Sequence, residues 1–70
     1  MDTICTGTVA DFDEARGIGH VQPEDGTVAL SFHCTQLADA SRTILPGTLV
    51  TYEVRVGLPG RWEAGAVTRR

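Results

Sequence analysis

Turn-forming residues divide this chain into short stretches, most of which are long enough for only one short strand. Proline, glycine or Asp-Gly signals fall at residues 13–17, 23–27, 46–47 and 57–60, and an Asp-Gly pair is typical of a β-hairpin. Between these turns apolar and polar residues alternate, which is the period of a strand with one face on a core. The spacing therefore restricts the chain to a small all-β fold.

Five strands are expected, over residues 4–12, 18–22, 28–33, 50–56 and 62–68. The alternation is clearest in residues 50–56, whereas residues 34–43 show no sustained period and are expected to form a loop with about one helical turn. Closing the strands into a barrel would remove the exposed edges that an open sheet leaves. We therefore expect a small five-stranded antiparallel barrel. Trp62 is expected to cover one end of it as part of the core, and exposure at a partner surface is the less favoured alternative.

The length and composition are those of one folded domain. A chain of 70 residues is too short for two domains, so a single domain over residues 1–70 is expected. Hydrophobic residues make up 41% and charged residues 21%, which argues against disorder. No apolar run approaches the roughly 20 residues of a membrane-spanning helix, and the N-terminus lacks the basic start of a secretion signal. We expect a cytoplasmic protein with no membrane partner.

The charge balance argues against tight binding of a polyanion. The net charge is −3, and the six basic residues are all arginine. Much of the free energy of non-specific nucleic-acid binding comes from neutralising phosphates with lysine and arginine. A local basic patch can still act despite the net sign, so weak binding stays open.

Neither catalysis nor a metal site finds support in the sequence. Cys5 and Cys34 lie far apart with no C-x-x-C spacing, so we expect both to be small buried or half-buried apolar residues. A metal site assembled in space from these cysteines with His20 and His33 is the less favoured alternative. No nucleophile stands at a recognisable spacing from a base, so we expect no enzyme, no metal and no cofactor.

Several blocks in fixed order resemble bacterial cold-shock proteins, from residue 7 almost to the C-terminus. They read GTVADFD at 7–13, RGIGHV at 16–21, PEDG at 23–26 leading into LSFHCTQL at 30–37, and SRTILPGTLVTYEV at 41–54, with a further match over 60–68. In the family the first two blocks read G-T-V-K-W-F-N and K-G-F-G-F-I at the same spacing. The resemblance implies a barrel of the cold-shock-domain type, which is a five-stranded antiparallel OB-fold.

The resemblance also implies binding of single-stranded RNA or DNA on the surface of the first three strands, where exposed aromatic rings stack on bases. Most of those rings are replaced here. The positions of the family's stacking tryptophan and phenylalanines are occupied by Asp11, Ile18, His20, Ser31 and Cys34. The expected core positions stay apolar or nearly so: Val9, Val21, Leu30, Phe32, Leu37, Ile44, Val50, Tyr52, Val54 and Val67.

We therefore expect weak or atypical contacts to single-stranded nucleic acid. Imidazole rings are modest stacking platforms, and two arginines fall where the family has basic residues. The expected contact residues are Phe12, Arg16, Ile18, His20, Ser31, His33, Arg42 and Trp62. The alternative is a barrel that has lost nucleic-acid binding and whose former binding face serves a protein partner or self-association, as a monomer or weak homodimer.

Overall fold

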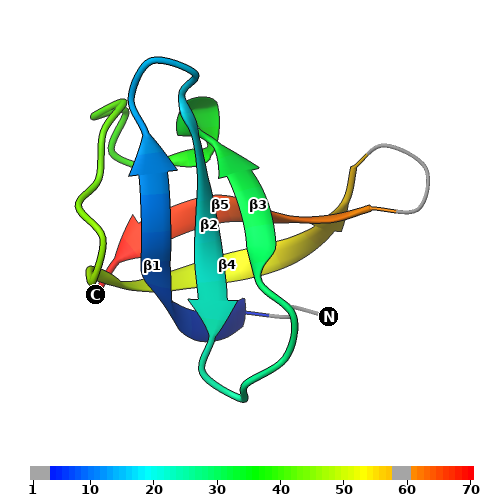
Figure 1. Cartoon of the computed structure of the whole chain (residues 1–70). Coiled ribbons are helices and arrows are strands. Elements are labelled where there is room, and N and C mark those ends of the chain that lie inside the picture. Colours follow the sequence, from blue (N-terminus) through cyan, green and yellow to red (C-terminus); the bar gives the residue numbers. More distant parts are fainter. Residues whose placement is uncertain (1–3, 58–60) are drawn as a thin grey trace.

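Five strands close into a barrel in the computed structural model, which describes residues 4–57 and 61–70. They are β1 (Ile4–Asp13), β2 (Ile18–Pro23), β3 (Leu30–His33), β4 (Leu49–Val56) and β5 (Trp62–Arg69), with a short 3-10 helix, η1 (Cys34–Gln36), after β3. Around the barrel the order is β1-β2-β3-β5-β4, and Figure 1 shows β4 and β5 crossing β1, β2 and β3. The expected five-stranded all-β barrel is therefore confirmed.

All strand pairings but one are antiparallel. β1 lies between β2 and β4, and β5 pairs with β4 along most of its length. β3 and β5 run parallel, and within residues 4–57 and 61–70 their register consists of the single pair Ser31 and Glu63. The barrel therefore closes over a short seam on this side.

The strand bounds differ from the expected ones mainly in β3. This strand begins at Leu30 instead of residue 28, because Val28 lies outside the barrel with 84% of its surface exposed. The other strands differ by one residue at one end. The expected turn at 57–60 includes residues 58–60, which lie outside the described residues. No helix in the described part of the chain is long and apolar enough to cross a membrane.

Side chains from every strand and from the loop after η1 fill the barrel. The buried apolar cluster consists of Val9, Val21, Phe32, Leu37, Ile44, Val50, Tyr52, Ala64 and Val67. All of these except Ala64 are expected core positions. Leu30 is half-buried and packs against the cluster, whereas Val54 is 37% exposed, which corrects the assignment of Val54 to the core. Cys5 and Cys34 are half-buried and pack against the cluster, as expected.

A β-bulge at Ala10 reverses the alternation of side chains in β1. The register with β2 passes from Val9 directly to Asp11, so Ala10 is an extra residue without a partner in that strand. In an unbroken strand Asp11 would point inward like Val9, and Phe12 would point outward. With the bulge, Asp11 is exposed and Phe12 packs against the core.

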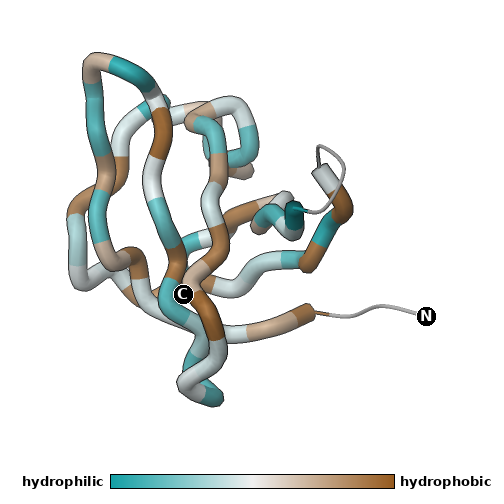
Figure 2. The backbone as a smooth tube through the Cα atoms, turned by 45° about the vertical axis from the view of Figure 1, so that its right-hand side comes forward, coloured by the Kyte–Doolittle hydropathy of each residue, from teal (hydrophilic) through white to brown (hydrophobic). Residues whose placement is uncertain are grey.

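β4 and β5 extend past the end of the barrel as a two-stranded ribbon (Figure 1). In the described chain β1 pairs with β4 only as far as Glu53, so the last part of β4 has β5 alone as a paired strand. Trp62 pairs with Val56 on this ribbon, and the two are 60% and 69% exposed. The expectation that Trp62 lies in the core is therefore wrong, because the ribbon runs beyond the body of the barrel. Figure 2 shows hydrophobic residues along the ribbon as well as along the strands of the barrel.

Candidate nucleic-acid interface

Two rows of side chains cross the outer surface of β1, β2 and β3. Residues paired directly across antiparallel strands point to the same side of a sheet. The register forms two such rows, which we call the outer face: Asp11, His20 and Ser31 in the first row, and Asp13, Ile18 and His33 in the second. All six are exposed or half-buried. The structure thus brings four sequence-predicted contact residues together: Ile18, His20, Ser31 and His33.

Asp11 and His20 form a hydrogen-bonded pair in the first row. The Nδ1 of His20 lies 2.8 Å from the Oδ1 of Asp11. An ionised carboxylate only accepts hydrogen bonds, so His20 donates from Nδ1 and leaves Nε2 for a ligand. Ser31 completes the row with a small hydroxyl. A base that approaches this row meets one imidazole ring between a carboxylate and a hydroxyl.

His33 is oriented by the start of η1. Its Nδ1 accepts a hydrogen bond from the backbone N–H of Thr35 at 3.2 Å and lies 2.9 Å from the hydroxyl of the same residue. With Nδ1 acting as an acceptor, the neutral ring carries its proton on Nε2, which is then available as a donor. Ile18, the neighbour of His33 in the second row, is 41% exposed and offers an apolar surface without a stacking ring.

Arg16 and Arg42 lie near the end of the outer face at which β1 turns into β2. Asp13 holds this turn, because its Oδ1 accepts two backbone N–H groups at 3.0 and 3.2 Å. The Nε of Arg16 lies 3.8 Å from the Asp13 carboxylate, and 79% of the Arg16 side chain is exposed, so a phosphate can reach it. The loop that carries Arg42 is held beside the turn by a hydrogen bond from the Thr43 hydroxyl to Glu14 at 2.8 Å.

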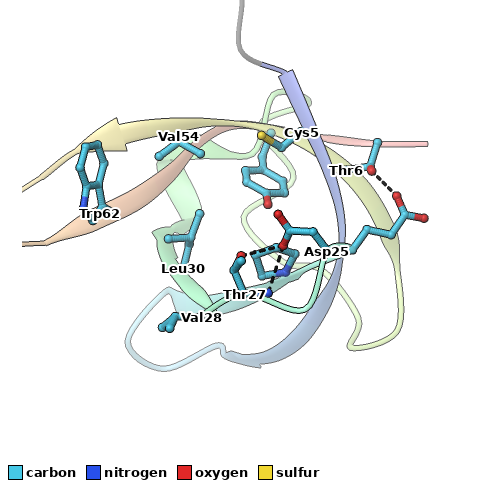
Figure 3. A pocket seen from close by; sticks show the side chains of 11 residues that line it. Cys5, Thr6, Asp25, Thr27, Val28, Leu30, Val54 and Trp62 are labelled. Atoms are coloured by element: carbon cyan, nitrogen blue, oxygen red, sulfur yellow. Dashed lines mark hydrogen bonds between the residues drawn. The ribbon is translucent and has the colours of Figure 1, made fainter.

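Phe12 and Trp62, the other two predicted contact residues, do not join the outer face. The bulge turns Phe12 to the inner side of the sheet, where its ring stacks on Phe32 with 5.9 Å between the ring centroids. Trp62 lines a groove together with Leu30, on the side of β3 opposite to Ser31 (Figure 3). Neither ring is placed to stack beside His20 or His33.

Opposite charges around the outer face nearly cancel. Carboxylates of Asp11, Asp13 and Glu14 stand against the guanidinium groups of Arg16 and Arg42. At the β1–β2 turn two guanidinium groups face two carboxylates, and along the first row Asp11 repels a polyanion, so this arrangement suits only weak contacts to a phosphate backbone. Within residues 4–57 and 61–70, no group of three or more His, Cys, Asp or Glu side chains is placed to hold a metal ion.

The Asp11–His20 pair is a feature that sequence reasoning missed. It depends on the register between β1 and β2, which the bulge at Ala10 shifts by one residue. The available signal is the spacing of the apolar residues in β1: Val9 and Phe12 are both on the inner side although a regular alternation would separate them. A strand that breaks period two in this way indicates a bulge, and the bulge fixes which residues face outward.

Comparison with known proteins confirms the resemblance. The family model described as the 'Cold-shock' DNA-binding domain matches residues 5–69, from β1 to β5. The chain is 37% identical to the cold shock-like protein CspD of Vibrio cholerae over 62 residues, which cover 86% of this chain and 80% of the relative. It is 34% identical to the cold shock protein CspA of Rhizobium meliloti over 50 residues, which cover 70% and 72%. The chain therefore belongs to the 'Cold-shock' DNA-binding domain family.

Proposed function

We propose that this chain binds single-stranded RNA or DNA weakly, in the cytoplasm, through the outer face of β1, β2 and β3. Membership of a family described as a DNA-binding domain supports a nucleic-acid-binding module. The proposal includes no catalytic step and requires no metal or cofactor. Base contacts are assigned to Ile18, His20, Ser31 and His33, and phosphate contacts to Arg16 and Arg42.

The first row, Asp11, His20 and Ser31, is the observation on which weak binding rests. The resemblance places stacking rings along this surface, whereas His20 supplies the one ring of this row. Each base stacked on an aromatic side chain contributes about 1–3 kcal/mol. Without three or four such contacts the affinity is expected to fall by roughly two to three powers of ten relative to a member that keeps its rings. The Asp11 carboxylate adds repulsion of phosphates.

The groups that remain suit contacts to phosphates and base edges better than stacking. The neutral ring of His33 presents its Nε2–H at the surface, and Arg16 presents an exposed guanidinium at the turn. Because such contacts depend on charge, binding should weaken steeply as salt rises, with a slope of log K against log salt of about −0.7 for each phosphate contacted.

A titration with labelled oligonucleotides tests the proposal. Fluorescein-labelled oligo-dT, oligo-U and a mixed-sequence RNA are followed by fluorescence anisotropy at low salt, where electrostatic attraction is greatest. We expect binding with a Kd below about 100 μM that is lost as salt approaches physiological strength. His33→Ala should weaken it, while Val56→Ser, a change on the exposed ribbon away from the outer face, serves as the matched control.

Absence of binding by all three oligonucleotides up to about 100 μM at low salt would remove the proposal. It would favour the alternative in which the outer face serves a protein partner or a second copy of the chain. Light scattering at the same protein concentrations distinguishes these two, because self-association raises the scattering mass without any added partner.

A further inference from the structure

A groove opens at the end of the barrel opposite to the β1–β2 turn. It has a volume of about 790 Å³ and lies between the ribbon, the start of β1 and the connection from β2 to β3 (Figure 3). Its apolar part is formed by Val28, Leu30, Val54 and Trp62. Val28 and Trp62 are 84% and 60% exposed. Apolar side chains gathered at this degree of exposure are typical of an interaction surface.

The other part of the groove is acidic. Asp25 accepts hydrogen bonds from the backbone N–H of Thr27 at 3.0 Å and from its hydroxyl at 2.7 Å, and these bonds lower the pKa of Asp25. Its carboxylate is therefore charged at neutral pH. Glu24 accepts a hydrogen bond from the Thr6 hydroxyl and lies 3.9 Å from the Arg70 guanidinium. None of the described residues that line the groove is basic.

The backbone beside the groove suits an extended segment. β3 and β5 share the single register pair Ser31 and Glu63 in the described chain, and residues 27–29 ahead of β3 form no regular secondary structure. An extended peptide can add main-chain hydrogen bonds at an incompletely paired edge while alternate side chains fill the adjoining pocket. The groove thus combines an apolar pocket, a carboxylate and an irregular stretch of backbone ahead of β3.

We propose that this groove docks an extended protein segment in which a bulky apolar side chain lies against Val28 and Trp62 and a neighbouring arginine or lysine pairs with Asp25. We choose a basic segment because its charge is opposite to that of the Asp25 carboxylate in the groove. The carboxylates repel the phosphates of a nucleic acid, and a second copy of this chain would bring a net charge of −3 to an acidic groove. Leu30 and Ser31 point to opposite sides of β3, so this site is separate from the outer face and does not rest on the proposed function.

The fluorescence of Trp62 provides the test, because it is the chain's single tryptophan and lines the groove. The full chain is titrated with a short acetylated peptide of alternating leucine and arginine, and in parallel with the same peptide carrying glutamate for arginine. We expect the basic peptide to shift the emission to shorter wavelength, with a Kd below about 1 mM at low salt. The acidic peptide should leave the emission unchanged.

Two exposed positions supply matched variants that leave the core intact. Val28→Ser should weaken binding of the basic peptide by about tenfold, the equivalent of one buried valine side chain. Leu45→Ser, at a residue that is 75% exposed and does not line the groove, should leave it unchanged. Asp25→Asn keeps an acceptor for Thr27 but loses the charge, and should weaken binding by about fivefold at low salt and less at high salt.

Three results would overturn the proposal. The first is equal binding of the acidic peptide, or no Trp62 response to the basic peptide up to about 1 mM. The second is a Trp62 response to oligo-dT as large as the response to the basic peptide, which would make the groove a nucleic-acid site. The third is a shift of Trp62 emission with concentration of the chain alone, accompanied by a rise in sedimenting mass, which would make a second copy the occupant.

Discussion

Placing two aromatic rings on the outer face should strengthen binding of single-stranded DNA. In the double variant Asp11→Trp with Ser31→Phe, rings would stand on both sides of His20, because the three residues are cross-strand partners. Neighbouring Cβ atoms in such a row lie about 4.5–5.5 Å apart, so the rings would form one platform. Asp11 is exposed and Ser31 half-buried, so the larger side chains can extend over the surface without displacing the core.

The size of the effect follows from the stacking contacts. Each restored ring should contribute at least about 1 kcal/mol, so two rings give about 2 kcal/mol, or roughly a 30-fold decrease in Kd for oligo-dT. Removing the Asp11 carboxylate adds a smaller gain because it ends the repulsion of phosphates. Loss of the exposed Asp11–His20 contact should change the free energy of unfolding by less than about 1 kcal/mol.

Fluorescence anisotropy with labelled oligo-dT at fixed low salt measures the gain, and circular dichroism confirms that the variant is folded. Asp11→Asn with Ser31 unchanged separates charge from ring, and we expect it to decrease Kd by no more than about fivefold. Val56→Phe adds a ring on the ribbon and should change nothing. A folded double variant with unchanged affinity would show that the outer face is not the binding surface, and an equal gain from Asp11→Asn alone would refute the stacking argument.

Three further changes probe the turn, the barrel and its pH dependence. Gly19→Ala should lower the free energy of unfolding in urea by about 1–3 kcal/mol, because its Cβ would lie 2.6 Å from a backbone oxygen of β1; an unchanged midpoint would contradict this packing. Hydrogen bonds from Ser41, and then the Arg69 guanidinium, lower the pKa of Asp39. The stabilisation of the parent over Asp39→Asn should therefore be full above the ordinary pKa of an aspartate and be lost as the pH falls through the lowered pKa of Asp39, as urea midpoints measured across the acidic range will reveal. Arg16→Gln should reduce the salt slope of oligo-U binding by about 0.7, the loss of one phosphate contact, and an unchanged slope would remove Arg16 from the site.

Most of the barrel could be predicted because its turns are local. Asp-Gly and Pro-Gly signals fix where strands end, and the spacing of the family blocks fixes their order. The incorrect assignments concern residues whose burial depends on contacts with parts of the chain that are distant in sequence. Val54 keeps the alternation of β4 but is 37% exposed, and it lines the groove at the end of the barrel. Trp62 lies on the part of β4 and β5 that extends beyond the barrel, and no local sequence pattern predicts where the barrel ends.

The candidate site was predictable in position but not in detail. The aligned blocks place Ile18, His20 and His33 on the surface of the first three strands, which is where the register puts them. Phe12 is the exception, because one extra residue in β1 exchanges the inner and outer sides for everything that follows it. Whether a ring is buried or exposed to a base thus depends on a single unpaired residue, whose one sequence signal is the broken alternation between Val9 and Phe12.

The shortest strand, β3, is where the two proposed surfaces meet. Its four residues alternate: Leu30 lines the groove and Phe32 lies in the core, while Ser31 and His33 belong to the outer face. Because side chains in a strand alternate strictly, no residue of β3 can serve both surfaces. The groove therefore uses none of the outer-face residues of β3. A change of His33 acts on the outer face alone, whereas a change of Leu30 acts on the groove and on the core against which it packs. A basic protein segment and a single strand of nucleic acid could then occupy the same barrel together, since the acidic groove lies at the end of the barrel away from the β1–β2 turn, where the exposed Arg16 stands beside the outer face.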